Sequence, residues 1–131
     1  MLRRKIETYI EDFLASRPQK ILILDGARQT GKTFIIRHVG QRMFRNYVEI
    51  NLLDDSLNER YFADALSTSD FYLQLSAVAG DKLGNNEDTL VFLDEIQAYP
   101  RLLTLLKFLN QDNRFTYIAS GSQLGIALLN T

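Results

Sequence analysis

The feature that most constrains the fold of this chain is an eight-residue string that combines two glycines with a lysine and a threonine. Glycines allow a backbone to curl until successive N–H groups point inward and form a nest for an anion. A string of this pattern, G-x-x-x-x-G-K-[ST], therefore predicts a phosphate-binding loop, with Lys32 reaching the β- and γ-phosphates and the Thr33 hydroxyl binding Mg²⁺. The residues of the predicted loop are Gly26, Ala27, Arg28, Gln29, Thr30, Gly31, Lys32 and Thr33.

The segments on either side of the string predict that it joins a strand to a helix. Ile21–Leu24 is a short apolar run that ends at Asp25, which is typical of a strand buried on both faces. From about Thr33 to Phe44, apolar residues recur at helical spacing. The amino end of that helix would add the positive end of its dipole to the loop, so the context strengthens the prediction of an anion site.

A second apolar run ends in two acidic residues. Leu90–Leu93 is followed at once by Asp94 and Glu95, as in a Walker B strand, whose Asp holds Mg²⁺ at the carboxyl end of the strand. Because open parallel sheets bind ligands at the carboxyl ends of their strands, both motifs are expected to meet at one edge. We therefore assign Asp94 to the metal ion and Glu95 to accepting a proton from the attacking water, or orienting it.

The remaining periodicities predict an α/β fold in which helices cover both faces of a parallel sheet. Tyr47 to Asn51 alternates between apolar and polar residues, which is typical of an edge strand. Further expected elements are a first helix over Leu2–Leu14, two short helices between Leu52 and Asp88, a helix over Leu102–Leu109 and a strand over Phe115–Ala119.

Composition narrows the class of protein. The 131 residues fit one domain, and 46% hydrophobic with 24% charged residues indicates a folded globular chain. Lys plus Arg total 15 against 16 Asp plus Glu, which argues against a dedicated nucleic-acid-binding module. Cysteine is absent from the sequence, which excludes disulfides, zinc sites and thiol chemistry. No apolar run approaches a membrane span, so a cytoplasmic protein without membrane contact is expected.

Three segments together resemble a known family. They are Gly26–Thr33, the string LVFLDEIQ over Leu90–Gln97, and IASGSQLG over Ile118–Gly125. In these the chain is similar to prokaryotic AAA+-type P-loop ATPases whose ATPase domain precedes a C-terminal domain of unknown function. The resemblance implies a three-layer α/β/α core with strand order 5-1-4-3-2, in which the strand at Phe115–Ala119 lies between the two apolar runs.

The resemblance also implies roles for particular residues. It places Lys32 and Thr33 on the phosphates and Mg²⁺, Asp94 on Mg²⁺, and Glu95 beside the attacking water. A polar sensor of the γ-phosphate is expected after the last strand, with Ser122 as first choice and Ser120 as second. Ordinary strand-end hydroxyls are an equal alternative for both serines.

The resemblance further implies that residues 1–131 are the N-terminal part of a longer ATPase, truncated before the fifth strand. The lid, the C-terminal domain and the usual position of an arginine finger would then follow Thr131. The expected partners are a nucleotide and either a second copy of the chain or its own C-terminal domain.

Three functions remain open from the sequence. The first is a Mg-ATP-dependent ATPase that acts as a motor or switch. The second is a nucleotide-gated scaffold that binds ATP without productive hydrolysis. The third, a small-molecule P-loop kinase, is disfavoured because a water-activating Glu95 works against transfer to a substrate hydroxyl.

Overall fold

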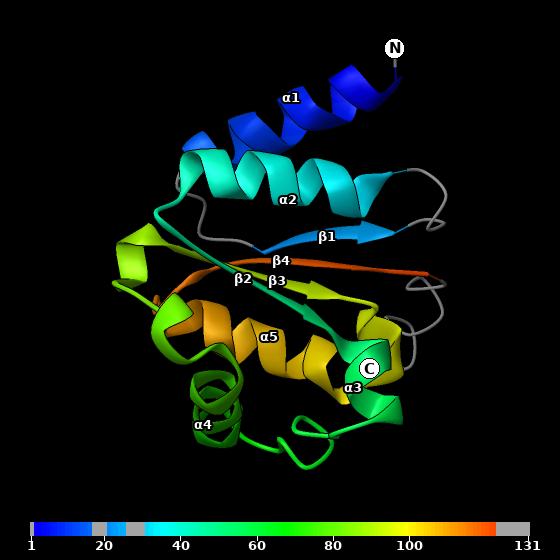
Figure 1. The fold of residues 1–131 in the computed structure, drawn as a ribbon, viewed down its shortest axis with the longest axis vertical. Coiled ribbons are helices and arrows are strands. Elements are labelled where there is room, and N and C mark those ends of the chain that lie inside the picture. Colours follow the sequence, from blue (N-terminus) through cyan, green and yellow to red (C-terminus); the bar gives the residue numbers. More distant parts are fainter. Residues whose placement is uncertain (1, 17–20, 26–30, 123–131) are drawn as a thin grey trace.

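The chain folds around a parallel four-stranded sheet in the order β1-β4-β3-β2, in a computed structural model that describes residues 2–16, 21–25 and 31–122 (Figure 1). All three strand pairs are parallel. This order confirms the α/β fold class and the 1-4-3-2 part of the expected arrangement. The strands are β1 (Leu22–Asp25), β2 (Asn46–Asn51), β3 (Thr89–Asp94) and β4 (Thr116–Gly121).

Helices cover both faces of the sheet, as the sequence predicts. Helices α1 (Leu2–Ala15) and α2 (Lys32–Met43) lie on one face (Figure 1). On the opposite face lie α3 (Leu52–Leu57), α4 (Thr68–Ala79) and α5 (Arg101–Gln111). Three short 3₁₀ turns complete the connections: η2 (Gly80–Lys82), η3 (Asn86–Asp88) and η4 (Ile96–Ala98).

Strand β3 is the centre of both cores. All six of its residues are buried. Successive side chains of a strand point to opposite faces, so Leu90 and Phe92 pack with α1 and α2, whereas Val91 and Leu93 pack with α4 and α5. The same alternation directs Asp94 toward the α2 face, where the phosphate loop of the sequence enters its helix.

The two outer strands of the described sheet, β2 and β1, differ in how well their burial matches the prediction from sequence. In β2, Val48 and Ile50 are buried while Tyr47 and Glu49 are half-buried, which confirms the one-sided edge strand. In β1, Leu22 is buried but Ile23 and Leu24 are only half-buried. The prediction of a strand buried on both faces is thus only partly right, because β1 pairs with β4 along one side among the described residues.

Two side chains define where the two short helices between Leu52 and Asp88 begin. The Asn51 side chain accepts a hydrogen bond from the backbone N–H of Asp54 at 3.0 Å and caps α3. Ser67 does the same for α4, accepting from the N–H of Asp70 at 3.1 Å. Such caps satisfy backbone donors that a helix start leaves unpaired, so the two short helices expected here have defined starts. Within the described residues, no helix combines the length and apolar character that crossing a bilayer requires.

Gly40 is a point of close approach between α2 and the sheet, and it yields a test of the packing. A Cβ at this position would lie 2.7 Å from a ring carbon of Tyr47 and 2.8 Å from a methyl carbon of Leu90. Overpacking of this kind costs about 1–3 kcal/mol, against about 1 kcal/mol gained in helix propensity. We expect Gly40→Ala to lower the free energy of unfolding by about 1 kcal/mol in urea titrations. Gln41→Ala, at the next and exposed position, is the control and should be neutral or stabilising; a stabilised Gly40→Ala would contradict the packing.

Candidate functional site

The described part of the phosphate loop begins at Gly31. Gly31 has φ 75° and ψ 14°, a left-handed conformation that glycine adopts without strain, and α2 starts at the next residue. A helix start at this point leaves the N–H groups of its first turn without partners in the helix, as an anion site requires. The predicted site residues Gly26, Ala27, Arg28, Gln29 and Thr30 lie outside the described residues.

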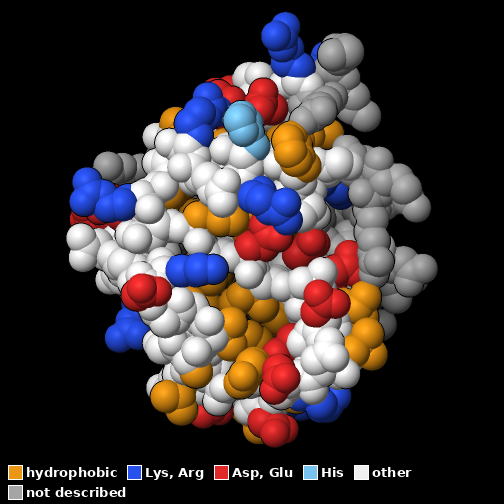
Figure 2. All heavy atoms as spheres, in the orientation of Figure 1, with side chains coloured by type: hydrophobic (Ala, Val, Ile, Leu, Met, Phe, Trp, Pro, Cys, Tyr) orange, Lys and Arg blue, Asp and Glu red, His pale blue; other side chains and the backbone are white. Residues whose placement is uncertain are grey.

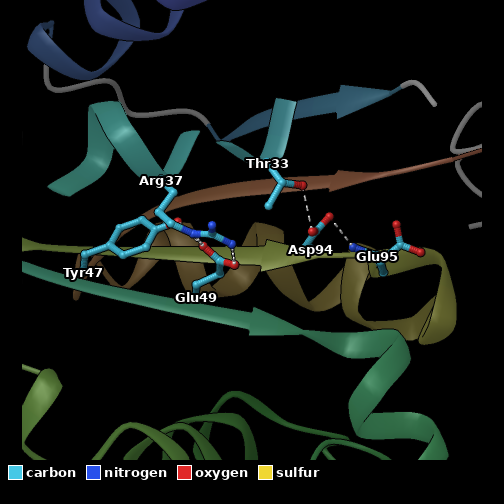
Figure 3. Close-up of polar contacts among 6 residues, drawn as sticks. All are labelled: Thr33, Arg37, Tyr47, Glu49, Asp94 and Glu95. Atoms are coloured by element: carbon cyan, nitrogen blue, oxygen red, sulfur yellow. Dashed lines mark hydrogen bonds and ion pairs between the residues drawn. The ribbon is translucent and has the colours of Figure 1, made fainter. Parts of the chain in front are cut away.

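The start of α2 is hydrogen-bonded to the end of β3. The Thr33 hydroxyl donates to Asp94 Oδ2 at 3.0 Å, across 61 positions of the sequence (Figure 3). This contact brings the two residues predicted to hold Mg²⁺ into one place. A single side-chain hydrogen bond therefore joins the two motifs that the sequence offers separately.

Lys32 is nearly enclosed beside these two residues. The residue as a whole is only 8% exposed. Burial lowers the pKa of Lys32, while the negative charges of Asp25 and Asp94 oppose that shift. A lysine that has already lost water interacts strongly with an incoming anion, because the local dielectric constant is low.

Asp94 is held by the residues on both sides of it. Its Oδ1 accepts a hydrogen bond from the backbone N–H of Glu95 at 2.9 Å, while Oδ2 accepts from Thr33. Burial raises the pKa of Asp94 above its ordinary range, even though both hydrogen bonds lower it. The charges of Glu95 and Glu49 add to the rise. Burial and the neighbouring carboxylates thus make the negative charge of Asp94 unfavourable. A cation bound beside Asp94 would offset that cost.

Glu95 occupies an unusual backbone position directly after β3. Its φ of 58° and ψ of 45° are left-handed, a region that costs a non-glycine residue about 1–2 kcal/mol. The residue is only 5% exposed, and its Oε2 accepts a hydrogen bond from the side-chain amide of Gln97 at 3.1 Å. The turn into η4 therefore keeps the Glu95 carboxylate at the carboxyl edge of the sheet instead of releasing it to solvent.

The two sensor candidates occupy different positions at the end of β4. Ser120 is buried inside the strand, whereas Ser122 is half-buried and follows it. Ser120 follows Ile118 by two positions, and Ile118 packs with α1 and α2, so strand alternation directs Ser120 to the face that carries Asp94. The backbone N–H of Ser122 donates to the side-chain oxygen of Gln97 at 3.3 Å. Both serines thus lie at the edge where the sequence expects a sensor.

A scan against protein-family models matches residues 18–130 to a family described as AAA domain. The chain belongs to this AAA domain family. Among solved structures, the fold is similar to that of C. elegans PCH-2, with a TM-score of 0.55 and 18% sequence identity. The match covers 98% of this chain and 39% of that one, so the chain spans well under half the length of the structure it resembles. No curated protein matches the chain.

In this AAA domain a cluster of Arg37, Tyr47 and Glu49 borders the Thr33–Asp94 pair, and it was not found from the sequence. Arg37 of α2 donates from Nε and Nη2 to the two carboxylate oxygens of Glu49 in β2, at 2.9 and 2.7 Å (Figure 3). The Tyr47 hydroxyl donates to Glu49 Oε1 at 2.8 Å. Basic and acidic side chains accordingly lie side by side over α2 and β2 (Figure 2).

The pairing with Arg37 stabilises the negative charge of Glu49, and that charge raises the pKa of the neighbouring Asp94. Burial alone would raise the pKa of Glu49, but hydrogen bonds from Arg37 and Tyr47 outweigh it and hold that pKa below its usual range. Arg37 lies outside the two sequence motifs that are assigned to the site. The signal that could have found the pair is a carboxylate on the half-buried face of an edge strand, beneath a helix that carries an arginine.

This pairing predicts a pH-dependent contribution to stability. Arg37→Met removes a two-pronged ion pair that is partly exposed, and should lower the free energy of unfolding by about 1 kcal/mol at pH 7. Since the pKa of Glu49 is depressed in the folded chain, the contribution is complete above the ordinary glutamate pKa and disappears as pH falls through the folded value. Urea titrations from pH 7 to pH 3 measure this. Arg101→Met, an exposed arginine on α5, should show no such dependence, and a wild-type advantage that grows in acid would refute the assignment.

Proposed function

We propose that this chain is a Mg-ATP-binding module and that the natural full-length protein hydrolyses ATP, using the cycle as a motor or switch. The observation that carries the proposal is the 3.0 Å hydrogen bond between Thr33 and Asp94. Membership in the AAA domain family supports nucleotide binding at this place. The buried Lys32, the left-handed Gly31 and the start of α2 supply the positive side of the site.

The two oxygen atoms of the pair suit a magnesium ion. Mg²⁺ takes ligands at about 2.1 Å in octahedral geometry, which places neighbouring ligand atoms about 3 Å apart. Thr33 Oγ1 and Asp94 Oδ2 have that separation. Protein sites for Mg²⁺ commonly supply one or two ligands and leave the rest to phosphate and water. When bound, the ion would neutralise charge that develops on the phosphate oxygens.

The side chains of the site divide the remaining work of hydrolysis. Lys32 pairs with the phosphate chain and offsets its charge in a poorly hydrated environment. Glu95 orients a water molecule and accepts its proton as the water attacks the γ-phosphorus and the bond to ADP breaks. Phosphoryl transfer requires little covalent participation from the protein, so this positioning and charge neutralisation carry the rate. Ser122 is the proposed sensor of the γ-phosphate at the neighbouring strand end, with Ser120 as the second choice.

Lys32 provides the test of nucleotide binding. Lys32→Ala should weaken binding of ATP by about 10- to 100-fold, because one charge-assisted hydrogen bond contributes about 1.5–3 kcal/mol. Isothermal titration calorimetry with Mg-ATP measures the affinity. Lys107→Ala, which removes an exposed lysine from α5, is the matched control and should bind as the wild type does. Undiminished affinity in Lys32→Ala would remove the phosphate site from the proposal.

A substitution at Glu95 tests whether the protein hydrolyses ATP or only binds it. Glu95→Gln keeps the size of the side chain but removes its basicity, so ATP should still bind while kcat falls by about 10²–10⁴-fold. Phosphate release by the natural full-length protein measures kcat, and Glu87→Gln, at an exposed position in η3, serves as control. If wild-type protein binds ATP tightly without releasing phosphate under any condition, the scaffold alternative replaces the ATPase. Unchanged turnover in Glu95→Gln would assign water activation to another residue.

A further inference from the structure

Gln97 connects two parts of the proposed site through the two ends of one side-chain amide. Its side-chain nitrogen donates to Glu95 Oε2 at 3.1 Å, and its side-chain oxygen accepts from the backbone N–H of Ser122 at 3.3 Å. Gln97 is half-buried in η4, the turn that follows β3. One amide group thus spans the gap between the acid after β3 and the residue after β4.

The chemistry of the two partners fixes which way this amide points. A backbone N–H can only donate, so the carbonyl oxygen of Gln97 must face Ser122. The NH₂ group then faces Glu95, whose carboxylate accepts hydrogen bonds when ionised. Both ends of the bridge are satisfied only in this orientation, and glutamine supplies a donor and an acceptor on one rigid plane.

We propose that Gln97 is a positioning residue for the ATPase reaction proposed above. Its amide holds the Glu95 carboxylate in place and ties it to the backbone at Ser122, so the water-activating group and the sensor segment keep a fixed relation. The inference rests on the proposed function, because positioning has a meaning only if Glu95 acts on water.

The backbone at Glu95 explains why such a support is needed. Glu95 follows the last residue of β3 in a left-handed conformation, and the ladder hydrogen bonds of the sheet end at Asp94. A reacting group must be held close to its productive geometry, and a displacement of about 1 Å lowers rates by up to about 100-fold. The amide of Gln97 supplies a fixed point for the carboxylate from a different part of the turn.

Two substitutions at position 97 separate the halves of the bridge. Gln97→Met keeps the approximate length of the side chain and removes both hydrogen bonds. Gln97→Glu keeps an acceptor for the Ser122 N–H but loses the donor to Glu95. We expect both variants to lower kcat by about 10- to 100-fold with little change in the KM for ATP. Gln111→Met, at the exposed end of α5, is the matched control and should leave kcat unchanged.

A double-mutant comparison shows whether the effect passes through Glu95. In single-turnover measurements, Gln97→Met should have little further effect once Glu95→Gln is present, because the group it positions is no longer a base. An equal loss in both backgrounds would mean that Gln97 only supports the fold, and would overturn the inference. Wild-type kcat in both Gln97 variants would overturn it as well.

The same data separate this inference from the proposed function. If Glu95→Gln slows hydrolysis and the Gln97 variants do not, the ATPase stands and the positioning role falls. If the wild-type protein releases no phosphate, both fall together. If Glu95→Gln is as fast as wild type, water activation belongs to another residue and the positioning role of Gln97 falls, while the ATPase stands. Thermal unfolding of each variant, measured with and without Mg-ATP, identifies a loss of kcat that comes from a misfolded chain. If Gln97→Met is misfolded, the kcat of Gln97→Glu decides whether Gln97 has the positioning role.

Discussion

Strand β3 is hydrogen-bonded to β2 on one side and to β4 on the other, and its side chains fill the cores on both faces of the sheet. A shift of one residue in such a strand would exchange its two faces, moving Leu90 and Phe92 into the wrong core. The register is therefore held by apolar packing along the whole strand. Because the register is fixed, Asp94 emerges on the α2 face within reach of Thr33, and Glu95 emerges at the sheet edge. The polar site depends on an apolar constraint.

The electrostatics of the site follow from that enclosure. Lys32 and Asp94 are both buried. Burial lowers the pKa of Lys32 and raises the pKa of Asp94, which favours the neutral form of each. The ion pair between Arg37 and Glu49 keeps a further carboxylate occupied at its border. A site in which charges of both signs are poorly hydrated gains more from a charged ligand than an open surface would. The ligands proposed above, the phosphate chain of a nucleotide and a divalent cation, carry the charges that would pair with Lys32 and Asp94 respectively.

The positions of the strands and of the first residues of α2 were predictable because they depend on patterns of neighbouring residues in the sequence. Apolar runs ending in Asp25 and Asp94 marked β1 and β3, and the eight-residue string marked the start of α2. The strand order came from the family resemblance, not from periodicity. The contact of Gln97 with Ser122 was not predictable, since it joins positions 25 residues apart through the three-dimensional fold. The contact of Arg37 with Glu49, 12 residues apart, was missed, and its one signal was the half-buried carboxylate of an edge strand. A polar residue that acts through a neighbouring strand end has no periodic signature.

The left-handed backbone of Glu95 has a consequence for how this chain could be altered. Glycine or asparagine would relieve the conformational cost at that position. A selection for heat resistance alone would favour those residues there and discard the carboxylate. Thermal stability and the water-activating role proposed for Glu95 would therefore compete at this one position, and variants improved in stability should be checked for ATP hydrolysis.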